Sequence, residues 1–436
     1  MAKNIFVGRT QELEKLQKLF EEVKNDLGKI IFIEGDPGSG KSTLVKNFIS
    51  KIKDDALVAV SECTLADNIH NAYAPFNEAI TKLKNKLKEE KTGNENKSEV
   101  KKHSKKIFNI LTKSGKNIAS TSLIGAGVVG IIEGIENEYL GKKEKEKDPE
   151  DKQRYFETVL RKFCEVKPVV LFIDDLQWAD KTSIDLFYRL GRSLKNDPFG
   201  IMIIGTYRPY EVKKRSITSQ DGSSQEVEHP FSALRNKLKR INTKDDTERT
   251  DEWFIEMAVP SFDNNNINEL INKQFPDNQF PGDFAEQLNK QTKGRALFIC
   301  QILDSLYENG DISQDDNGKY ILKVDAMDKL PSTIEAVIKE RLSRLGDKLK
   351  EVVNFASVTG EDFYLQIIQK LLEIEGVKGQ RELFNHLNDL EDDKGIIVSD
   401  EKGQLNFDEI YLDIYHFTHT LHHKYIYVCL QKQNNV

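Results

Sequence analysis

The 436-residue sequence predicts an α/β fold in which a domain with a parallel β-sheet is followed, toward the end of the chain, by helices and a small β-wing. Three observations predict it. An apolar run at 29–34 leads into a glycine-rich loop and then into a segment with apolar residues on one helical face. Two more apolar runs, at 169–173 and 200–205, have the composition of buried parallel strands. Toward the end of the chain, strand-like runs at 395–399 and 411–417 follow amphipathic helical patterns.

The composition is that of a globular protein large enough for about two to four domains. Hydrophobic residues make up 38% and charged residues 31% of the chain. The net charge of −7 argues against a dedicated nucleic-acid binder, which is usually basic. The four cysteines have no metal-ligand spacing and are typical of reduced thiols. The N-terminus lacks the apolar segment of a signal peptide. We therefore expect a cytoplasmic protein.

The glycine-rich loop is the most specific motif, because it fits Gly-x4-Gly-Lys-Ser between a strand and a helix. Its glycines let the backbone curl so that N–H groups point at a di- or triphosphate, and the helix N-terminus adds partial positive charge. Lys41 is predicted to reach the β- and γ-phosphates, and the Ser42 hydroxyl to bind Mg²⁺. The loop residues expected at the nucleotide are Gly35, Asp36, Pro37, Gly38, Ser39, Gly40, Lys41, Ser42 and Thr43. The sequence thus predicts a P-loop NTPase domain.

Polar residues at the ends of the next two predicted strands would complete this site. Asp174 is expected to hold Mg²⁺ through water, and Asp175 to orient or deprotonate the attacking water. Thr206 and Arg208 end the following strand, where a cation can sense the γ-phosphate and stabilise charge in the transition state. Taken alone, the aspartates could mark a simple strand end, and Arg208 could be a surface residue. Beside the phosphate loop they form the predicted catalytic set, Lys41, Asp174, Asp175 and Arg208.

Three segments resemble motifs of the STAND class, a group of AAA+-related signal-transduction NTPases. Residues 6–13 are similar to the family's opening Val-Gly-Arg-x-x-Glu-Leu. Residues 174–180 match the signature Asp-Asp-Leu-Gln-Trp-Ala-Asp of one bacterial branch, which includes activators of the maltose-regulon type and ATPase modules attached to adenylate cyclases and kinases. Residues 206–209 match the Thr-Tyr-Arg-Pro sensor strand of that branch. The resemblance implies an ATPase with adenine as the base.

Three downstream segments extend the resemblance to most of the chain outside roughly residues 85–150. Residues 292–298 are similar to an element of the family's helical lid. Residues 330–334 resemble the start of its winged-helix domain, and residues 416–419 resemble its late Phe-x-His element. The resemblance therefore implies a lid and a winged helix after the P-loop domain.

The resemblance also implies nucleotide contacts outside the loop. His419 is expected to contact the β-phosphate of bound ADP. The backbone near Val7 and Arg9 is expected to form the base-binding edge. One residue departs from the family's pattern, since Ala296 stands where the lid carries a proline on the adenine side.

We expect three domains along the chain. They are a P-loop nucleotide-binding domain at 1–260 with an insertion at about 85–150, a helical lid at 261–330, and a winged-helix domain at 331–436. Apolar residues at helical spacing after Pro331 support a helix at the start of the last domain.

The insertion contains the longest apolar stretch of the chain, at 118–135, between lysine-rich flanks. It could pack against the protein's own domains or a neighbouring subunit, associate with a membrane through the flanking lysines, or become ordered only with a partner. Glu133 and a cluster of serine and threonine count against a membrane span. The flanks lack the interleaved aromatic residues of a nucleic-acid-binding segment. We favour packing within the protein or between subunits.

The function that the sequence favours is an ATP-dependent signalling switch with slow, Mg²⁺-dependent hydrolysis, in a bacterial signalling or defence complex. ADP would hold a closed state. ATP would favour an open state that assembles as a homo-oligomer or engages a partner effector or sensor protein. Arg235 and Arg240 are candidates for an arginine finger that acts on a neighbouring subunit's nucleotide. The expected cofactors are ATP or ADP with Mg²⁺.

Two alternatives stay open. A nucleic-acid-remodelling ATPase of the origin-recognition or clamp-loader kind shares the opening motif, the loop and a terminal winged helix, but the acidic charge and residues 176–180 argue against it. A scaffold that binds ATP without turning it over is the third interpretation. Since the sequence shows no sensor or effector motif, we expect either a switch portion of a longer protein or separate sensor and effector chains.

Overall fold

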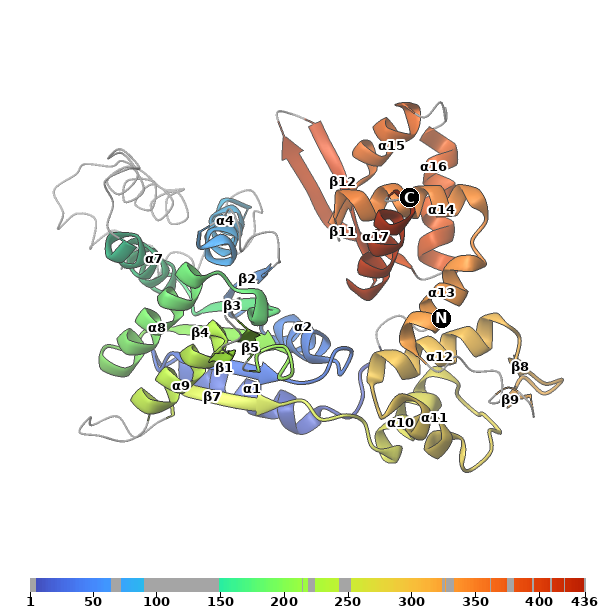
Figure 1. The fold of residues 1–436 in the computed structure, drawn as a ribbon, viewed down its shortest axis with the longest axis horizontal. Coiled ribbons are helices and arrows are strands. Elements are labelled where there is room, and N and C mark those ends of the chain that lie inside the picture. The colour runs from blue at the N-terminus through green and yellow to red at the C-terminus, as the bar shows by residue number, and fades with distance from the viewer. Residues whose placement is uncertain are drawn as a thin grey trace, which may run out of the picture. The chain divides into compact units, whose positions relative to one another are not determined.

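The chain forms two compact units in the computed structural model (Figure 1). The first consists of Met1–Gln274 with Lys293–Leu297, and the second of Phe275–Thr292 with Phe298–Val436. The structure describes residues 5–63, 72–89, 149–213, 215–218, 224–242, 252–323, 326, 333–360, 362–374, 380–393, 396–407, 410–418 and 420–434.

A five-stranded parallel sheet forms the centre of the first unit, as predicted. Its strands, in spatial order, are β2 (Leu57–Glu62), β3 (Val169–Asp174), β4 (Ile201–Tyr207), β1 (Lys29–Glu34) and β7 (Phe254–Ala258). In the registers of the central strands, Ile31 pairs with Ile204, and Leu171 pairs with Ile203. The central strands β1, β3 and β4 coincide with the three apolar runs that the sequence predicted as strands.

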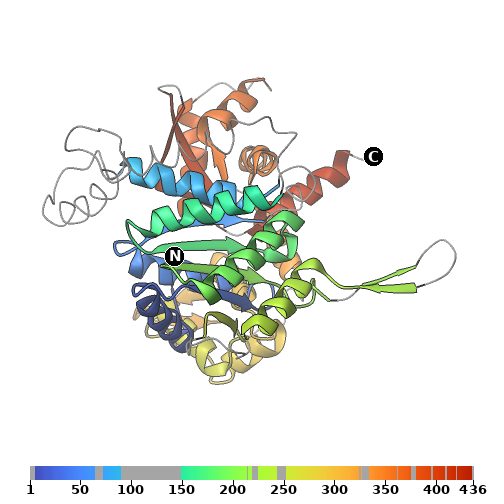
Figure 2. The ribbon, with the colours of Figure 1, turned by 90° about the vertical axis from the view of Figure 1, so that its left-hand side faces the viewer.

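Helices cover both faces of this sheet (Figure 2). One face carries α1 (Thr10–Val23) and α2 (Lys41–Ile52), and the other carries α4 (Ala74–Glu89), α7 (Pro149–Cys164), α8 (Lys181–Asn196) and α9 (Pro230–Asn242). Because both faces are buried, the central strands are apolar at nearly every position rather than alternating with polar residues.

Alternate residues of β1 anchor the two cores. Phe32 packs with Phe187 and Phe231 on the second face, with ring centroids 5.8 and 5.0 Å apart. On the first face, Phe20 and Phe48 meet edge to face at 6.1 Å, and Ile31 belongs to the same cluster. The strand that leads into the phosphate loop is therefore fixed from both sides.

Two further elements belong to the first unit. The strands β5 (Arg215–Thr218) and β6 (Ser224–Val227) pair in an antiparallel hairpin between β4 and α9, and this hairpin projects from the unit (Figure 2). After β7, the chain continues into α10 (Asn264–Gln274).

The second unit is mainly helical with two small antiparallel sheets. Its first part contains α11 (Phe284–Thr292), α12 (Ala296–Glu308), which begins in the first unit, β8 (Ile312–Gln314) and β9 (Tyr320–Leu322). Its second part contains α13 (Ile334–Ser343), α14 (Asp347–Thr359), β10 (Asp362–Tyr364), α15 (Leu365–Ile374), α16 (Gln380–Asn388), the short π-helix η4 (Asp389–Asp393), β11 (Ile397–Phe407), β12 (Ile410–Phe417) and α17 (Thr420–Asn434).

The predicted helix and strands near the C-terminus are present. Helix α13 begins after Thr333, whose hydroxyl accepts a hydrogen bond from the Ala336 N–H at 3.2 Å, as an N-cap does. Strands β11 and β12 pair antiparallel, with β10 on the far side of β12. The winged-helix assignment of this region stays a prediction.

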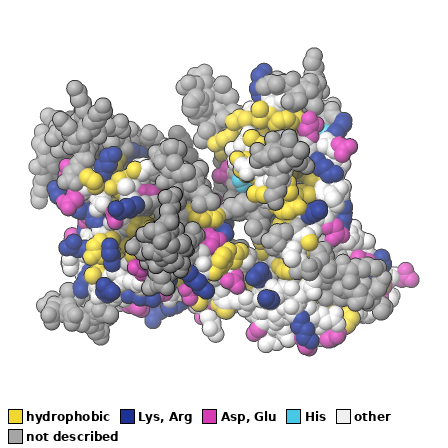
Figure 3. Space-filling model, in the orientation of Figure 1, with side chains coloured by type: hydrophobic (Ala, Val, Ile, Leu, Met, Phe, Trp, Pro, Cys, Tyr) yellow, Lys and Arg dark blue, Asp and Glu magenta, His cyan; other side chains and the backbone are white. Residues whose placement is uncertain are grey.

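Apolar side chains gather on the visible face of the second unit (Figure 3). On this unit, α14 and α17 border an open groove of about 390 Å³ that includes Phe355, Val358 and Leu430. Within the part of the chain that the structure describes, no helix combines the length and the apolar character needed to cross a bilayer. The stretch 118–135 lies outside the described residues.

Candidate nucleotide-binding and hydrolysis site

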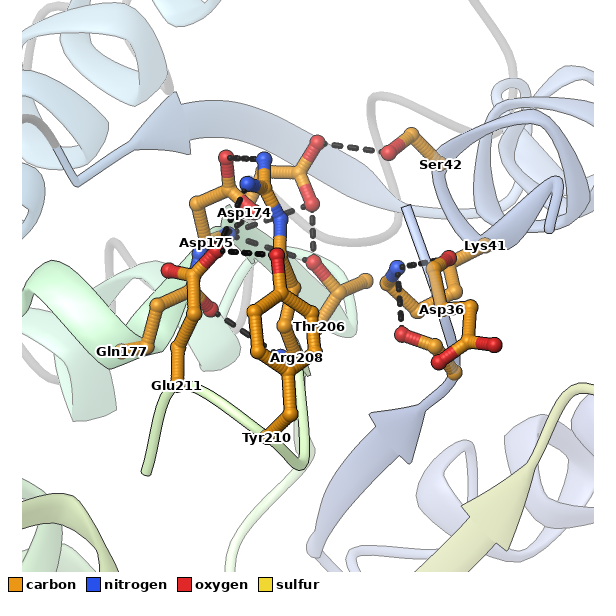
Figure 4. Close-up of polar contacts among 11 residues, drawn as sticks. Asp36, Lys41, Ser42, Asp174, Asp175, Gln177, Thr206, Arg208, Tyr210 and Glu211 are labelled. Atoms are coloured by element: carbon orange, nitrogen blue, oxygen red, sulfur yellow. Dashed lines mark hydrogen bonds and ion pairs between the residues drawn. The ribbon is translucent and has the colours of Figure 1, made fainter. Parts of the chain in front are cut away.

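The strand order brings the predicted site residues to one edge of the sheet. Strand β4 lies between β1 and β3, so the carboxyl end of β4 lies between the start of the glycine-rich loop and Asp174. Ligands of open parallel sheets bind at this carboxyl edge. The fold thus places Lys41, Asp174 and Thr206, which are distant in sequence, around one site (Figure 4).

The loop before α2 has the conformation that its glycines allow. Gly38 and Gly40 have φ angles of +75° and +93°, in the left-handed region that favours glycine. A Cβ atom on Gly38 would lie 2.9 Å from the Cβ of Leu297. Helix α2 begins at Lys41, immediately after Gly40. The N–H groups of its first turn have no partner within the helix and lie next to the loop. This arrangement is suited to binding phosphate.

Lys41 is a buried cation inside this loop. Its Nζ atom donates to the carbonyl oxygens of Gly35 and Asp36, at 3.0 and 3.1 Å (Figure 4). Burial lowers the pKa of Lys41, and the nearby Asp174 and Asp175 only partly oppose this effect. A phosphate group bound in the loop would supply a further negative charge to this ammonium group.

Asp174 is fixed by hydroxyl groups from two elements. The Ser42 hydroxyl at the start of α2 donates to Asp174 Oδ2 at 2.6 Å. The hydroxyl of Thr206, a fully buried residue on β4, donates to the other carboxylate oxygen. The Asp175 N–H donates to Asp174 Oδ1 and to the Thr206 hydroxyl, at 3.2 Å each. An alcohol and a carboxylate side by side are the oxygen ligands that Mg²⁺ prefers, so Ser42 and Asp174 fit the predicted metal site.

Asp175 is held at both carboxylate oxygens. It lies directly after β3 with a φ of +55°, a left-handed conformation that aspartate tolerates better than most residues. Its Oδ1 accepts a hydrogen bond from Gln177 Nε2 at 2.8 Å. Its Oδ2 accepts one from Arg208 Nη2 at 2.9 Å, in an ion pair. The predicted water-activating carboxylate is therefore paired with the predicted γ-phosphate sensor (Figure 4).

Arg208 is surrounded by groups that keep it charged. Burial opposes the charge, but Asp175 and Glu211 outweigh burial and raise the pKa of Arg208. Its Nη1 atom pairs with Glu211 at 2.9 Å, and its guanidinium carbon lies 5.0 Å from the ring centre of Trp178. Arg208 thus remains a cation at the sheet edge.

The short 3₁₀ turn η2 (Leu176–Trp178) sets the direction of Asp175. Leu176 is fully buried, and its side chain fills the space above Gly205 on β4. A Cβ atom on Gly205 would lie 2.1 Å from the Leu176 Cδ1 atom. The missing side chain at Gly205 therefore lets this turn lie directly against the sheet.

Arg9 contacts the backbone of the glycine-rich loop. Its buried guanidinium donates from Nη2 to the Ser39 carbonyl at 3.1 Å and to the Pro260 carbonyl at 2.6 Å. It also lies over the Phe262 ring, 4.7 Å from its centre. The neighbouring Val7 is buried as well. The structure thus gives Arg9 contacts with the loop backbone and with the segment after β7.

The segment that resembles the lid element also touches the loop. The Leu297 N–H donates to the Gly38 carbonyl at 2.9 Å. Ala296, which replaces the family's proline, is the first residue of α12. The Gly294 carbonyl accepts a hydrogen bond from the Phe262 N–H at 2.8 Å, which ties this segment to the chain after β7.

The two arginine-finger candidates both lie on α9. Arg235, a finger candidate on α9, pairs with Glu256 of its own chain at 2.7 Å and lies over the Tyr207 ring, 4.6 Å from its centre. Arg240 is an exposed residue of the same helix. His419 lies outside the described residues.

Two residues of the signature 174–180 have roles that sequence reasoning missed. Asp180 is the N-cap of α8 and accepts a hydrogen bond from the Ser183 N–H at 2.9 Å. An aspartate just before an amphipathic segment is a signal that could have found this cap. Gln177, which contacts Asp175, carries no such local signal.

Comparison with known proteins finds similarities to solved structures and to one family model. No curated protein sequence matches the chain. Solved structures with a similar arrangement include a Walker-type ATPase of Pyrococcus abyssi, with 14% identity, coverage of 97% of this chain and 96% of that one, and a TM-score of 0.40. They also include Cdc6p of Pyrobaculum aerophilum, with 14% identity, coverage of 99% and 97%, and a TM-score of 0.39. Another is a structure of Drosophila ORC bound to DNA, with 10% identity, coverage of 99% and 88%, and a TM-score of 0.40.

The family comparison concerns the first half of the chain. Residues 5–204 match the family model described as an AAA ATPase domain. This range contains the glycine-rich loop, the paired aspartates and most of the parallel sheet. The parallel sheet and the glycine-rich loop before α2 are those of a P-loop NTPase fold, and residues 5–204 are similar to the AAA ATPase domain family.

Proposed function

We propose that this protein is a nucleotide-dependent switch that binds ATP with Mg²⁺, hydrolyses it slowly, and uses the exchange between ATP and ADP to control assembly or a partner protein. The observation that carries the proposal is the 2.9 Å ion pair between Arg208 and Asp175. Arg208, which is expected at the γ-phosphate, is thus paired with Asp175, which is expected to act on the attacking water. Arrival of a γ-phosphate would therefore change the contacts of both residues at once.

Each residue of the site has a role in this proposal. Lys41 and the N-terminus of α2 would bind the phosphates. Ser42 and Asp174 would hold Mg²⁺, which supplies charge neutralisation at the phosphates. Asp175 would accept the proton of a water molecule whose oxygen bonds to the γ-phosphorus, while the bond from that phosphorus to the β–γ bridging oxygen breaks. Arg208 would stabilise the charge that develops on the γ-phosphate.

Contacts around the loop support coupling to the rest of the chain. Arg9 ties the Ser39 carbonyl to the segment after β7, and Leu297 ties the Gly38 carbonyl to the start of α12. A change in loop conformation would alter both attachments. This link, together with the resemblance of 174–180 and 206–209 to a STAND branch, supports a signalling role with an oligomeric or effector partner.

Nucleotide content and turnover test the proposal directly. The purified chain would be denatured and the released nucleotide identified by chromatography, and hydrolysis of radiolabelled ATP–Mg²⁺ would be followed with and without duplex DNA. We expect bound ADP and slow hydrolysis that DNA does not alter. Hydrolysis that duplex DNA accelerates in a salt-dependent way would favour the nucleic-acid-remodelling alternative. A wild-type protein with no measurable turnover would favour the scaffold.

A further inference from the structure

Gln177 is a buried polar residue to which the proposed reaction gives no role so far. It lies in the turn η2, and its side chain is 4% exposed. Its Nε2 atom donates to Asp175 Oδ1 at 2.8 Å. Its Oε1 atom accepts a hydrogen bond from the Arg208 N–H at 3.2 Å. One amide group thus connects the carboxylate after β3 with the backbone after β4 (Figure 4).

The two groups that hold Asp175 differ in what fixes them. Arg208 reaches Asp175 with the guanidinium group at the end of a long side chain. The proposed function requires the same guanidinium group at the γ-phosphate. Gln177 reaches Asp175 with the nitrogen of its side-chain amide, and the oxygen of the same amide accepts a hydrogen bond from a backbone N–H group. If Arg208 turns toward a γ-phosphate, Oδ2 loses its ion-pair partner, while Oδ1 keeps its amide donor.

We propose that Gln177 is a positioning residue for hydrolysis: it keeps Asp175 aimed through Oδ1 while Arg208 leaves Oδ2 for the γ-phosphate. This inference rests on the proposed function, because it requires Asp175 to act on the attacking water. A neutral amide suits the role, since it orients the carboxylate without adding a second positive charge beside it. The hydrogen bond to the Arg208 backbone keeps the amide in place whichever way the Arg208 side chain points.

Two substitutions separate the contacts of Gln177. Gln177→Leu removes both hydrogen bonds at similar volume. Gln177→Glu keeps an acceptor for the Arg208 N–H and removes the donor to Asp175. We expect each to lower kcat for ATP hydrolysis by about 10- to 100-fold, the loss typical of a misplaced catalytic group, with the Kd of a fluorescent ATP analogue changed by less than about 3-fold. If the leucine variant does not fold, the glutamate variant carries the same test.

A double-mutant cycle distinguishes positioning from structural support. If Gln177 acts through Asp175, Gln177→Leu or Gln177→Glu should add less than about 2-fold to the loss already caused by Asp175→Asn, measured in single-turnover hydrolysis. The same fold-loss in both backgrounds, or a loss of ATP affinity equal to the loss of kcat, would overturn the inference and leave the proposed function standing. An Asp175→Asn variant that hydrolyses ATP like the wild type would instead overturn the proposed role of Asp175.

Discussion

Thr206 shows how a single hydroxyl group can organise the metal side of the site. It is fully buried at the end of β4, donates to Asp174, and accepts a hydrogen bond from the Asp175 N–H. Both aspartates therefore depend on one side chain from a neighbouring strand. The positions of Asp174 and Asp175 are therefore fixed by β4 as well as by β3, the strand that they follow or end.

Replacing this hydroxyl tests that arrangement. Thr206→Val keeps the shape but leaves Asp174 with one fewer donor, so we expect the free energy of unfolding to fall by about 1 kcal/mol. We also expect a higher Mg²⁺ concentration for half-maximal hydrolysis. Denaturant unfolding and a Mg²⁺ titration measure the two effects. Thr206→Ser keeps the hydroxyl and serves as the control. Valine and serine variants with equal Mg²⁺ dependence would contradict this role.

Lys41 is a second residue whose surroundings make a clear prediction. Burial lowers the pKa of Lys41, because removal from water destabilises the charged ammonium group. Lys41→Ala should weaken ATP binding by about 10- to 150-fold, the range of one charge-assisted hydrogen bond, without lowering the stability of the nucleotide-free protein. Isothermal titration and thermal unfolding check both parts. The exposed Lys46 on the same helix provides the control, as Lys46→Ala. Comparable losses of affinity in the two variants would count against the assignment.

At the scale of elements, the turn η2 depends on its contact with β4. Because a Cβ atom on Gly205 would lie 2.1 Å from Leu176, Gly205→Ala should push the turn away from the sheet. We expect a loss of about 1–3 kcal/mol of stability, as for other overpacked sites, together with slower hydrolysis. Gly282→Ala is the matched control, because no atom lies within 4 Å of the added Cβ. Equal stability of the two variants in denaturant would show that Leu176 moves aside easily.

Elements differ in how clearly the sequence predicts them. The central strands β1, β3 and β4 are buried on both faces, which leaves continuous apolar runs, and these were predicted. The edge strands β2 and β7 were not predicted as strands, although β2 begins with the short apolar run 57–60. The spatial order of the strands is set by contacts between distant segments, so no local pattern shows it.

In the site, too, local patterns could be predicted from the sequence and contacts between distant segments could not. The glycine-rich loop is contiguous, and its chemistry can be predicted from the order of its residues. The pairing of Arg208 with Asp175, and of Gln177 with both, depends on side chains that meet only after β3 and β4 lie side by side. The backbone near Val7 and Arg9 stays the predicted base-binding edge. The contacts of the Arg9 guanidinium with the carbonyls of Ser39 and Pro260 were not predicted, because they join segments distant in sequence.

At the scale of the whole molecule, the chain passes from the first compact unit to the second within α12. Leu297 of the first unit contacts the phosphate loop, and the remainder of α12 belongs to the second unit. A switch requires that the two nucleotides stabilise different states of the chain, because a ligand with equal affinity for both states shifts nothing. The γ-phosphate is the only chemical difference between them. Lys41, Arg208 and the Mg²⁺ ligands are the residues expected to detect it.

The mass of the native protein tests this claim most directly. The full chain would be measured by native mass spectrometry with ADP and with a non-hydrolysable ATP analogue plus Mg²⁺, beside the Lys41→Ala variant. A switch should remain a monomer with ADP and form a larger assembly with the ATP analogue, and the variant should stay monomeric in both. A wild-type mass that is the same with either nucleotide would contradict the account.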